Sequence, residues 1–162
     1  MKKVLAIAVV ASSLLFSCFK NLNGTTVTST CTPISDSAQE NSIKAFCIAD
    51  TVDFDKYVKD TNYVYYHLSD TGTGAAASSS SVIFFTYKAT LLNKTLIDQS
   101  ATPVQSAMVN LIPGFQLMSP FLKKGTHIQM VIPSSLAYGC EGSGQIPSNA
   151  PLFYDVTITD VE

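Results

Sequence analysis

The last third of the chain carries the stretch that decides the fold: LIPGF at residues 111–115, IPSSLAYG at residues 132–139 and IPSNAPL at residues 146–152. Pro113 follows an apolar pair at a position where a helix can begin, because proline already has a helical φ and the first helical residues need no backbone donor. The other two segments read as loops that connect strands. Together, these segments favour a pocket lined by apolar and aromatic side chains over an acid–base site.

The segments around this stretch predict a sheet. Residues 82–92 are too apolar for a strand with a solvated face, and we expect them in the middle of the sheet. Residues 127–132 alternate in polarity, which places Ile128, Met130 and Ile132 on one face, the expected core face. Further strands are expected at residues 63–68, 96–98, 104–109 and 152–158. Several antiparallel strands over one short helix make an α+β fold.

The helix that begins at Pro113 is expected to be short. Gly125 follows the basic pair Lys123-Lys124 and predicts the end of this helix. Pro120 lies inside that span, where a proline removes a backbone hydrogen bond and clashes with the preceding turn. We therefore expect a helix of about two turns, kinked or finished near Ser119.

These motifs resemble those of FKBP-type peptidyl-prolyl cis-trans isomerases, in the form of bacterial exported lipoproteins, and the likeness runs from about Tyr65 to Glu162. The resemblance implies an antiparallel β-sheet wrapped around a short α-helix, here preceded by an N-terminal helical extension. It also implies that the Ile112 N–H and the Tyr138 hydroxyl hydrogen-bond to substrate carbonyls, while Asp98 orients polar groups at the rim. The further residues implied to bind substrate are Tyr87, Ile97, Val104, Leu111, Phe115, Ile146 and Tyr154.

The chemistry expected of such a pocket is rotation about an X-Pro peptide bond. The barrier of about 18–20 kcal/mol reflects amide resonance, which is lost in the twisted transition state. An apolar cavity disfavours the dipolar planar ground state more than the twisted state. This mechanism requires no general base, nucleophile, metal or cofactor.

Several positions differ from the family pattern and leave other functions open. Ile97 and Val104 stand where Phe is common in the family, Phe115 where Trp is frequent, and Ala89 replaces a Gly. The main prediction is an isomerase that acts on exported proteins. The alternative is a weakly active or inactive FKBP-fold chaperone that binds proline-containing segments, and a third reading is a structural envelope lipoprotein. Rapamycin-like macrolides are candidate ligands of the pocket.

The N-terminus predicts an export signal. Lys2 and Lys3 precede a short apolar run, which closes with a Ser-Cys pair at Cys18. The run is shorter than the ~20 residues that a membrane-spanning helix needs. We expect residues 1–17 to be a lipoprotein signal peptide and Cys18 to be lipidated, with plain secretion as the alternative. Phe19 is not an inner-membrane retention residue, so the expected location is the outer membrane, facing the periplasm.

The region between this signal and the sheet contains no chemistry that we can identify. It starts with a stretch rich in Thr, Ser and Asn, which lacks apolar periodicity and predicts a flexible tether. Ser35 or Asp36 can cap a helix with apolar residues on one face, and a second short helix is expected at residues 54–59. The expected divisions are a tether over 18–35, a helical segment over 36–62 and the isomerase domain over 63–162.

Three cysteines remain once Cys18 is set aside: Cys31, Cys47 and Cys140. Disulfides persist in the oxidising compartments that exported proteins reach, so an odd number implies one pair with a leftover thiol, or three thiols. Cys31–Cys47 is the expected pair, because both residues precede the isomerase core. No Cys-x-x-Cys motif is present, which argues against a zinc or thioredoxin-like site.

The charge of the chain limits its partners. Charged residues make up 14% of the sequence, and the formal net charge is −2. The sequence has no basic stripe and no cluster of Lys or Arg among aromatic residues, so nucleic-acid binding is not expected. The expected partners are proline-containing polypeptides and, through the lipid anchor, a membrane.

Overall fold

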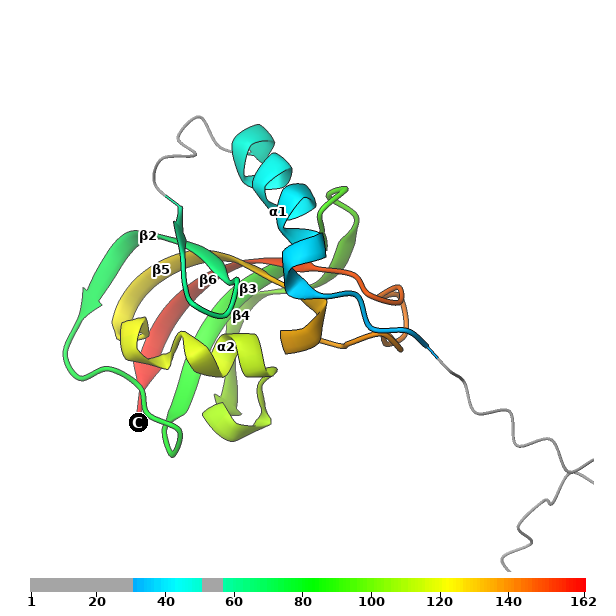
Figure 1. Cartoon of the computed structure of the whole chain (residues 1–162). Coiled ribbons are helices and arrows are strands. Elements are labelled where there is room, and N and C mark those ends of the chain that lie inside the picture. The colour runs from blue at the N-terminus through cyan, green and yellow to red at the C-terminus, as the bar shows by residue number, and fades with distance from the viewer. Residues whose placement is uncertain (1–30, 51–56) are drawn as a thin grey trace, which may run out of the picture. The chain divides into compact units, whose positions relative to one another are not determined.

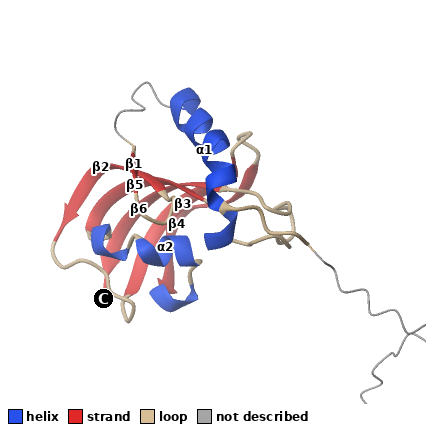
Figure 2. Ribbon diagram, in the orientation of Figure 1, coloured by secondary structure: helices blue, strands red, loops and turns tan. Residues whose placement is uncertain are grey.

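A computed structural model describes residues 31–50 and 57–162 of the chain (Figure 1). The strands form one antiparallel sheet in the order β1-β2-β5-β6-β3-β4. The α+β fold predicted from the sequence, a sheet around a short helix with a further helix before it, is confirmed (Figure 2). The elements are α1 (Asp36–Asp50), β1 (Val58–Lys59), β2 (Tyr65–Thr73), β3 (Val82–Leu91), β4 (Leu96–Ala107), α2 (Pro113–Leu117), β5 (Lys124–Ile132) and β6 (Leu152–Val161), with 3-10 turns at Met108–Asn110, Ser119–Phe121 and Ser134–Leu136.

One face of the sheet packs against α2. Ile128, Met130 and Ile132 of β5 are fully buried on this side, as the alternation of the strand predicts. Pro113 is the first residue of α2, also as predicted. Gly114 lets the helix approach the sheet closely, because a Cβ at this position would lie 2.3 Å from Ile132 Cγ2. Because glycine has no side chain, Gly114 sets the short distance between α2 and β5.

The opposite face of the sheet is covered by α1, and Figure 1 shows the two helices on opposite sides. The Ala38 N–H donates to Ser35 Oγ at 3.3 Å, so Ser35 caps the helix. Val131 of β5 faces α1, whereas its neighbours in the strand face α2, because successive residues of a strand point to opposite faces. The buried cluster on this side consists of Ile43, Phe46, Cys47, Tyr57, Tyr65, Val131 and Phe153.

The prediction of two short strands at residues 96–98 and 104–109 is wrong, because β4 is continuous from Leu96 to Ala107. Its pairing with β3 shifts register between Phe85 and Tyr87 and again between Ala89 and Thr90. Such bulges let a strand bend while its pairing continues on both sides. The residues between the two predicted strands have low β-propensity and are held in the sheet by this pairing.

Two further local predictions are wrong. Residues 58–59 pair with β2 as strand β1, although the sequence favours a helix there, and residues 54–56 of that expected helix lie outside the described residues. Gly125 lies inside β5 with φ +84° instead of ending a helix. The helix has already finished at Leu117, and Pro120 lies in the 3-10 turn that follows, close to the predicted end near Ser119.

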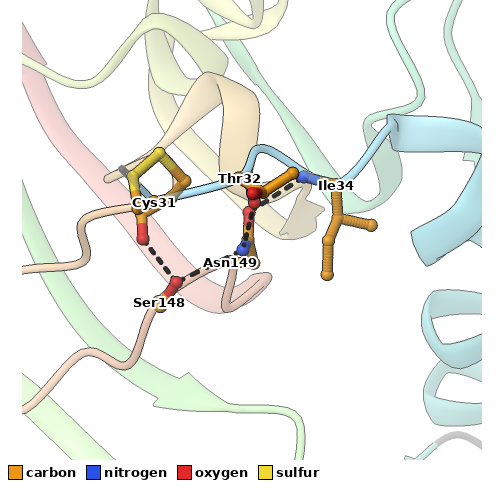
Figure 3. The surroundings of a disulfide bond; sticks show 6 residues. Cys31, Thr32, Ile34, Ser148 and Asn149 are labelled. Carbon is orange, nitrogen blue, oxygen red and sulfur yellow. Dashed lines mark hydrogen bonds between the residues drawn. A yellow bond between two sulfur atoms is a disulfide. The ribbon is translucent and has the colours of Figure 1, made fainter. Parts of the chain in front are cut away.

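The disulfide joins Cys31 to Cys140, whose Cα atoms lie 5.5 Å apart (Figure 3). The expected Cys31–Cys47 pair is therefore wrong. Cys47 is a buried residue of α1, and it packs in the cluster between that helix and the sheet. The prediction paired Cys31 with Cys47 from their positions in the sequence, whereas folding brings Cys140 next to Cys31.

The expected tether also ends earlier than residue 35, because residues 31–34 are held by the disulfide and by hydrogen bonds to Asn149. Residues 18–30 of that tether lie outside the described residues. So do residues 1–17 and Cys18, on which the signal-peptide and lipidation predictions rest. In the described part of the chain, no helix has the length and apolar character needed to cross a bilayer.

Candidate active site

A cavity of about 460 Å³ opens between α2, the sheet and the loop that precedes β6. Every residue that the sequence predicts to bind or act on substrate lines this cavity. The structure thus brings together positions that are spread over more than sixty residues of sequence. The lining consists of Phe85, Tyr87, Ala89, Ile97, Asp98, Val104, Asn110, Leu111, Ile112, Phe115, Tyr138, Ile146 and Tyr154.

The strands supply one wall of the cavity through their alternation. Phe85, Tyr87 and Ala89 are alternate residues of β3 and therefore share a face. Ala89 pairs with Asp98 of β4 on one side and with Tyr154 of β6 on the other. Because Ala89 carries only a methyl group, the larger side chains on both sides of it border an open space.

The floor of the cavity is aromatic. Phe115 of α2 is 2% exposed, and its ring meets the ring of Tyr154 edge to face, with centroids 6.0 Å apart and planes at 87°. The Phe85 ring lies 5.6 Å from Phe115 on another side. Edge-to-face and tilted arrangements of this kind are the ones that aromatic rings prefer, so the floor is fixed by its own packing.

One rim of the cavity carries a hydrogen-bonded pair. The Tyr87 hydroxyl donates to Asp98 Oδ2 at 2.5 Å, and the Gln99 N–H donates to Asp98 Oδ1 at 2.8 Å. Burial, followed by the hydrogen bond to the Asp98 carboxylate, raises the pKa of Tyr87 to about 12. Tyr87 therefore stays a neutral donor at physiological pH and holds the carboxylate of Asp98 in one orientation.

The loop side of the cavity places Tyr138 against Tyr154. Tyr138 is 37% exposed at the mouth, and Ile146 from the same loop is 8% exposed. Burial raises the pKa of Tyr154 well above its usual value, and the neighbouring Tyr138 raises it further. The Tyr154 hydroxyl, deep in the cavity, is consequently a neutral donor near pH 7.

The segment that leads into α2 presents a backbone donor. Ile112 is the N-cap residue of the helix with φ −59° and ψ 149°, and its carbonyl accepts the Phe115 N–H at 2.9 Å. None of the hydrogen bonds among residues 31–50 and 57–162 uses the Ile112 N–H. Gln116 Nε2 donates to the Leu111 carbonyl at 2.7 Å, which fixes the backbone just before this donor.

The cavity also contains residues that the sequence reasoning did not assign to it. Phe85 could have been found from its spacing, because it lies two residues before Tyr87 on the same strand and so faces the same way. Asn110 has no such signal, because it lies in the 3-10 turn Met108–Asn110 after β4. The lining is mainly apolar and aromatic, and its polar groups are the Asp98 carboxylate, the Asn110 amide, the tyrosine hydroxyls and the Ile112 N–H.

Comparison with protein families and known proteins agrees with this geometry. A family model described as FKBP-type peptidyl-prolyl cis-trans isomerase matches residues 74–159, more than half of the chain. The FKBP-type peptidyl-prolyl cis-trans isomerase FkpA of Buchnera aphidicola (strain APS) is 33% identical over 132 residues, which cover 79% of this chain and 55% of that protein. FkpA of Escherichia coli K12 is 36% identical over 100 residues, which cover 60% of this chain and 37% of that protein.

Solved structures show the same fold. The crystal structure of FkpA from Escherichia coli superposes with a TM-score of 0.68 at 28% identity, covering 78% of this chain and 59% of that chain. A peptidyl-prolyl cis-trans isomerase from Pseudomonas syringae has a TM-score of 0.66 at 22% identity, covering 81% of this chain and 98% of that chain. The chain spans about half of the length of FkpA from Buchnera aphidicola and less than half of the length of FkpA from Escherichia coli K12.

Proposed function

Because the chain belongs to the family of FKBP-type peptidyl-prolyl cis-trans isomerases, we propose that it accelerates cis–trans rotation about X-Pro bonds in other polypeptides. The observation that carries this proposal is the aromatic cavity between α2 and the sheet, which gathers all the residues expected of such a site. The proline-containing substrates are proposed on the same basis.

The floor and wall would receive the proline ring. Phe115, Tyr154 and Phe85 offer aromatic faces and edges around an apolar space, while Ile97 and Val104 narrow its sides. In this space the planar, dipolar amide loses the solvation by water that stabilises it. The twisted amide is less dipolar and therefore loses less solvation free energy in the cavity, so the barrier to rotation falls.

The rim would hold the chain on either side of the proline. The Ile112 N–H and the Tyr138 hydroxyl would donate to substrate carbonyls, and Asp98, oriented by Tyr87, would accept polar hydrogens of the substrate backbone. Lowering the barrier by about 6–8 kcal/mol would give roughly 10⁴–10⁶-fold acceleration. Every group in this mechanism acts by shape and hydrogen bonding, and no bond is broken.

The experiment that tests the function is an isomerisation assay on a short X-Pro peptide, using the chain from Phe19 onward, with and without rapamycin. Acceleration that rapamycin inhibits is the expected result and would support both the activity and the cavity. Acceleration that resists rapamycin would indicate that Ile97 and Val104 have reshaped the macrolide-binding part of the cavity. No acceleration by a folded sample would overturn the enzymatic proposal and favour the proline-binding chaperone.

We also propose that the protein is a lipoprotein anchored to the outer membrane and facing the periplasm. The support is the Ser-Cys pair that closes the apolar run at Cys18, together with the Cys31–Cys140 disulfide, because disulfides persist mainly in oxidising compartments. Cells that express the full chain should incorporate labelled palmitate into it, and Cys18→Ser should abolish the label. An unlabelled wild-type protein released in soluble form would contradict the anchor.

A further inference from the structure

The loop over residues 134–149, here called the site loop, supplies two residues of the cavity, Tyr138 and Ile146. It is closed on itself by short-range hydrogen bonds. The Asn149 N–H donates to the Gly139 carbonyl at 3.0 Å, and residues 143 and 146 pair with each other through both backbone groups at 3.0 and 2.8 Å. The loop is therefore a compact platform, and whatever fixes the platform fixes two walls of the cavity.

Residues 31–39, here called the strap, run beside this platform and attach to it at several points. The Asn149 side chain lies between two strap residues: its Nδ2 donates to the Thr32 carbonyl at 3.0 Å, and its Oδ1 accepts the Ile34 N–H at 3.0 Å (Figure 3). The disulfide between Cys31 and Cys140 adds a covalent attachment two residues after Tyr138. These contacts hold the far end of the loop.

The near end of the loop is held by a buried amide. Gln39 of α1 is 5% exposed and Ser134 is 2% exposed. Gln39 Nε2 donates to Ser134 Oγ at 2.7 Å, while Gln39 Oε1 accepts the Ser134 N–H at 3.1 Å. Ser135 Oγ also donates to Asp36 Oδ1 at 2.6 Å. Both ends of the buried Gln39 amide thus form hydrogen bonds with Ser134, and these two bonds together fix the position of Ser134 at the start of the loop.

We propose that the strap positions the site loop of the candidate active site, and that the positioning residues are Gln39 of the strap and Asn149 of the loop. Neither residue lines the cavity; both act through the loop that carries Tyr138 and Ile146. Misplacing substrate-positioning groups by about 1 Å can cost up to about 100-fold in rate, so an untethered loop would weaken the grip on the substrate chain. The N-terminal segment thus belongs to the catalytic unit and has a role beyond covering the back of the sheet.

Asn149→Gly is the variant that tests the far attachment. Asn149 has φ +56°, a conformation that glycine adopts without strain, so the variant keeps the backbone and its N–H while removing the side-chain bonds to the strap. Gln39→Met tests the near attachment, because it keeps the length of the side chain and removes both bonds to Ser134. Asn41→Ala is the matched control, since Asn41 is an exposed residue of α1 two positions after Gln39, and none of the side-chain hydrogen bonds between described residues includes it.

Two readouts are needed, and both use the full folded chain at a temperature well below its unfolding. The first is hydrogen exchange of the amides in residues 137–149, which we expect to become at least tenfold faster in Asn149→Gly and Gln39→Met and to stay unchanged in Asn41→Ala. The second is the kinetics with an X-Pro peptide, in which we expect the two strap variants to raise KM about tenfold with kcat within about twofold. A purely structural role would lower the folded fraction, and with it kcat, at constant KM.

The outcomes separate this proposal from the proposed isomerase activity, on which its kinetic part rests. The positioning role of the strap would be overturned if the wild type is active but Asn149→Gly and Gln39→Met change neither the hydrogen exchange of the loop nor the KM. If the wild type does not accelerate X-Pro rotation, the activity fails on its own, and the exchange rates still decide whether the strap holds the loop.

Discussion

Tyr138 is the side chain that best separates the chemistry of the cavity from its shape. Tyr138→Phe removes only the hydroxyl, because the ring can stay where it is at the mouth. Loss of one hydrogen bond to the substrate should lower kcat/KM about 5- to 10-fold, the equivalent of roughly 1 kcal/mol. Stability should change by less than about 0.5 kcal/mol, because the residue is partly exposed. Steady-state isomerisation kinetics and urea unfolding measure the two effects.

Asp98→Ala provides the comparison for this prediction. If peptide affinity is retained while turnover falls in both variants, the rim acts on the rotating bond as proposed. If neither quantity changes, the roles assigned to Asp98 and Tyr138 are wrong, although the cavity itself remains.

Most residues of the cavity were predictable because they lie in short motifs that resemble those of the FKBP family, whereas Phe85 and Asn110 were missed. LIPGF at residues 111–115 places Leu111, Ile112 and Phe115 at the start of a helix, and the family resemblance assigns Tyr87 to the pocket. The hydrogen bond from Tyr87 to Asp98 and the contact of Phe115 with Tyr154 were not predictable in the same way, because they depend on register shifts between strands and on the distance between α2 and the sheet.

The position of α2 depends on Gly114, which gives a test of how this helix sets the cavity floor. In Gly114→Ala the new Cβ would meet Ile132 Cγ2, so the helix must move away from β5. Overpacking of this kind costs about 1–3 kcal/mol. Because Phe115 follows directly, we expect a loss of isomerase activity as well as a lower free energy of unfolding in urea.

A double-mutant cycle provides the control for Gly114→Ala. The same substitution in an Ile132→Ala background should cost less, because the side chain that it meets has been removed. Equal costs in the two backgrounds would show that the destabilisation has another origin.

The attachment of α1 to the sheet predicts a dependence of stability on pH. Hydrogen bonds from Lys44, Tyr65 and Lys59 lower the pKa of Glu40 to about 2. A carboxylate whose pKa is lower in the folded state stabilises the fold above its unfolded pKa near 4.5, and this contribution is lost as the pH falls towards 2. The difference in unfolding free energy between wild type and Glu40→Gln should therefore be largest near pH 6 and shrink towards pH 2.

Denaturant unfolding at several pH values measures this difference. Glu141→Gln is the control, because Glu141 is exposed and forms no ion pair within the described residues. A wild-type advantage over Glu40→Gln that persists unchanged at pH 2 would contradict the assigned contacts.

The elements themselves could be predicted to different degrees. The predicted strands at residues 82–92 and 127–132 match β3 and β5 closely, because continuous apolar content and strict alternation are strong local signals. β1 was missed because two residues cannot show a period, and it exists only through its pairing with β2. The cap of α1 was predictable from Ser35, whereas its role at the site loop was not, since it depends on contacts between residues far apart in sequence.

The disulfide joins two cysteines that are 109 positions apart in the sequence, and the loop that it closes contains every described strand except β6. Closing a loop of about 100 residues removes enough freedom from the unfolded chain to stabilise a protein by up to about 4–5 kcal/mol. Reduction should therefore lower the unfolding free energy by about 2–5 kcal/mol, measured in urea with and without a thiol reductant.

The double variant Cys31→Ser/Cys140→Ser should match the reduced wild type and show no response to the reductant. A wild type that unfolds identically with and without reductant would mean that the cross-link contributes nothing to stability. Cys47 provides no substitute for either cysteine, because it is a buried residue of α1 that packs against the sheet.

The order of the strands bears on how this chain can be made. β6 follows every other described strand in the sequence, yet it lies between β5 and β3 and pairs with both. During synthesis, β2 and β5 can form one ribbon and β3 and β4 another, but the two ribbons cannot join until residues 152–161 have left the ribosome. The nascent polypeptide thus stays open until late in translation.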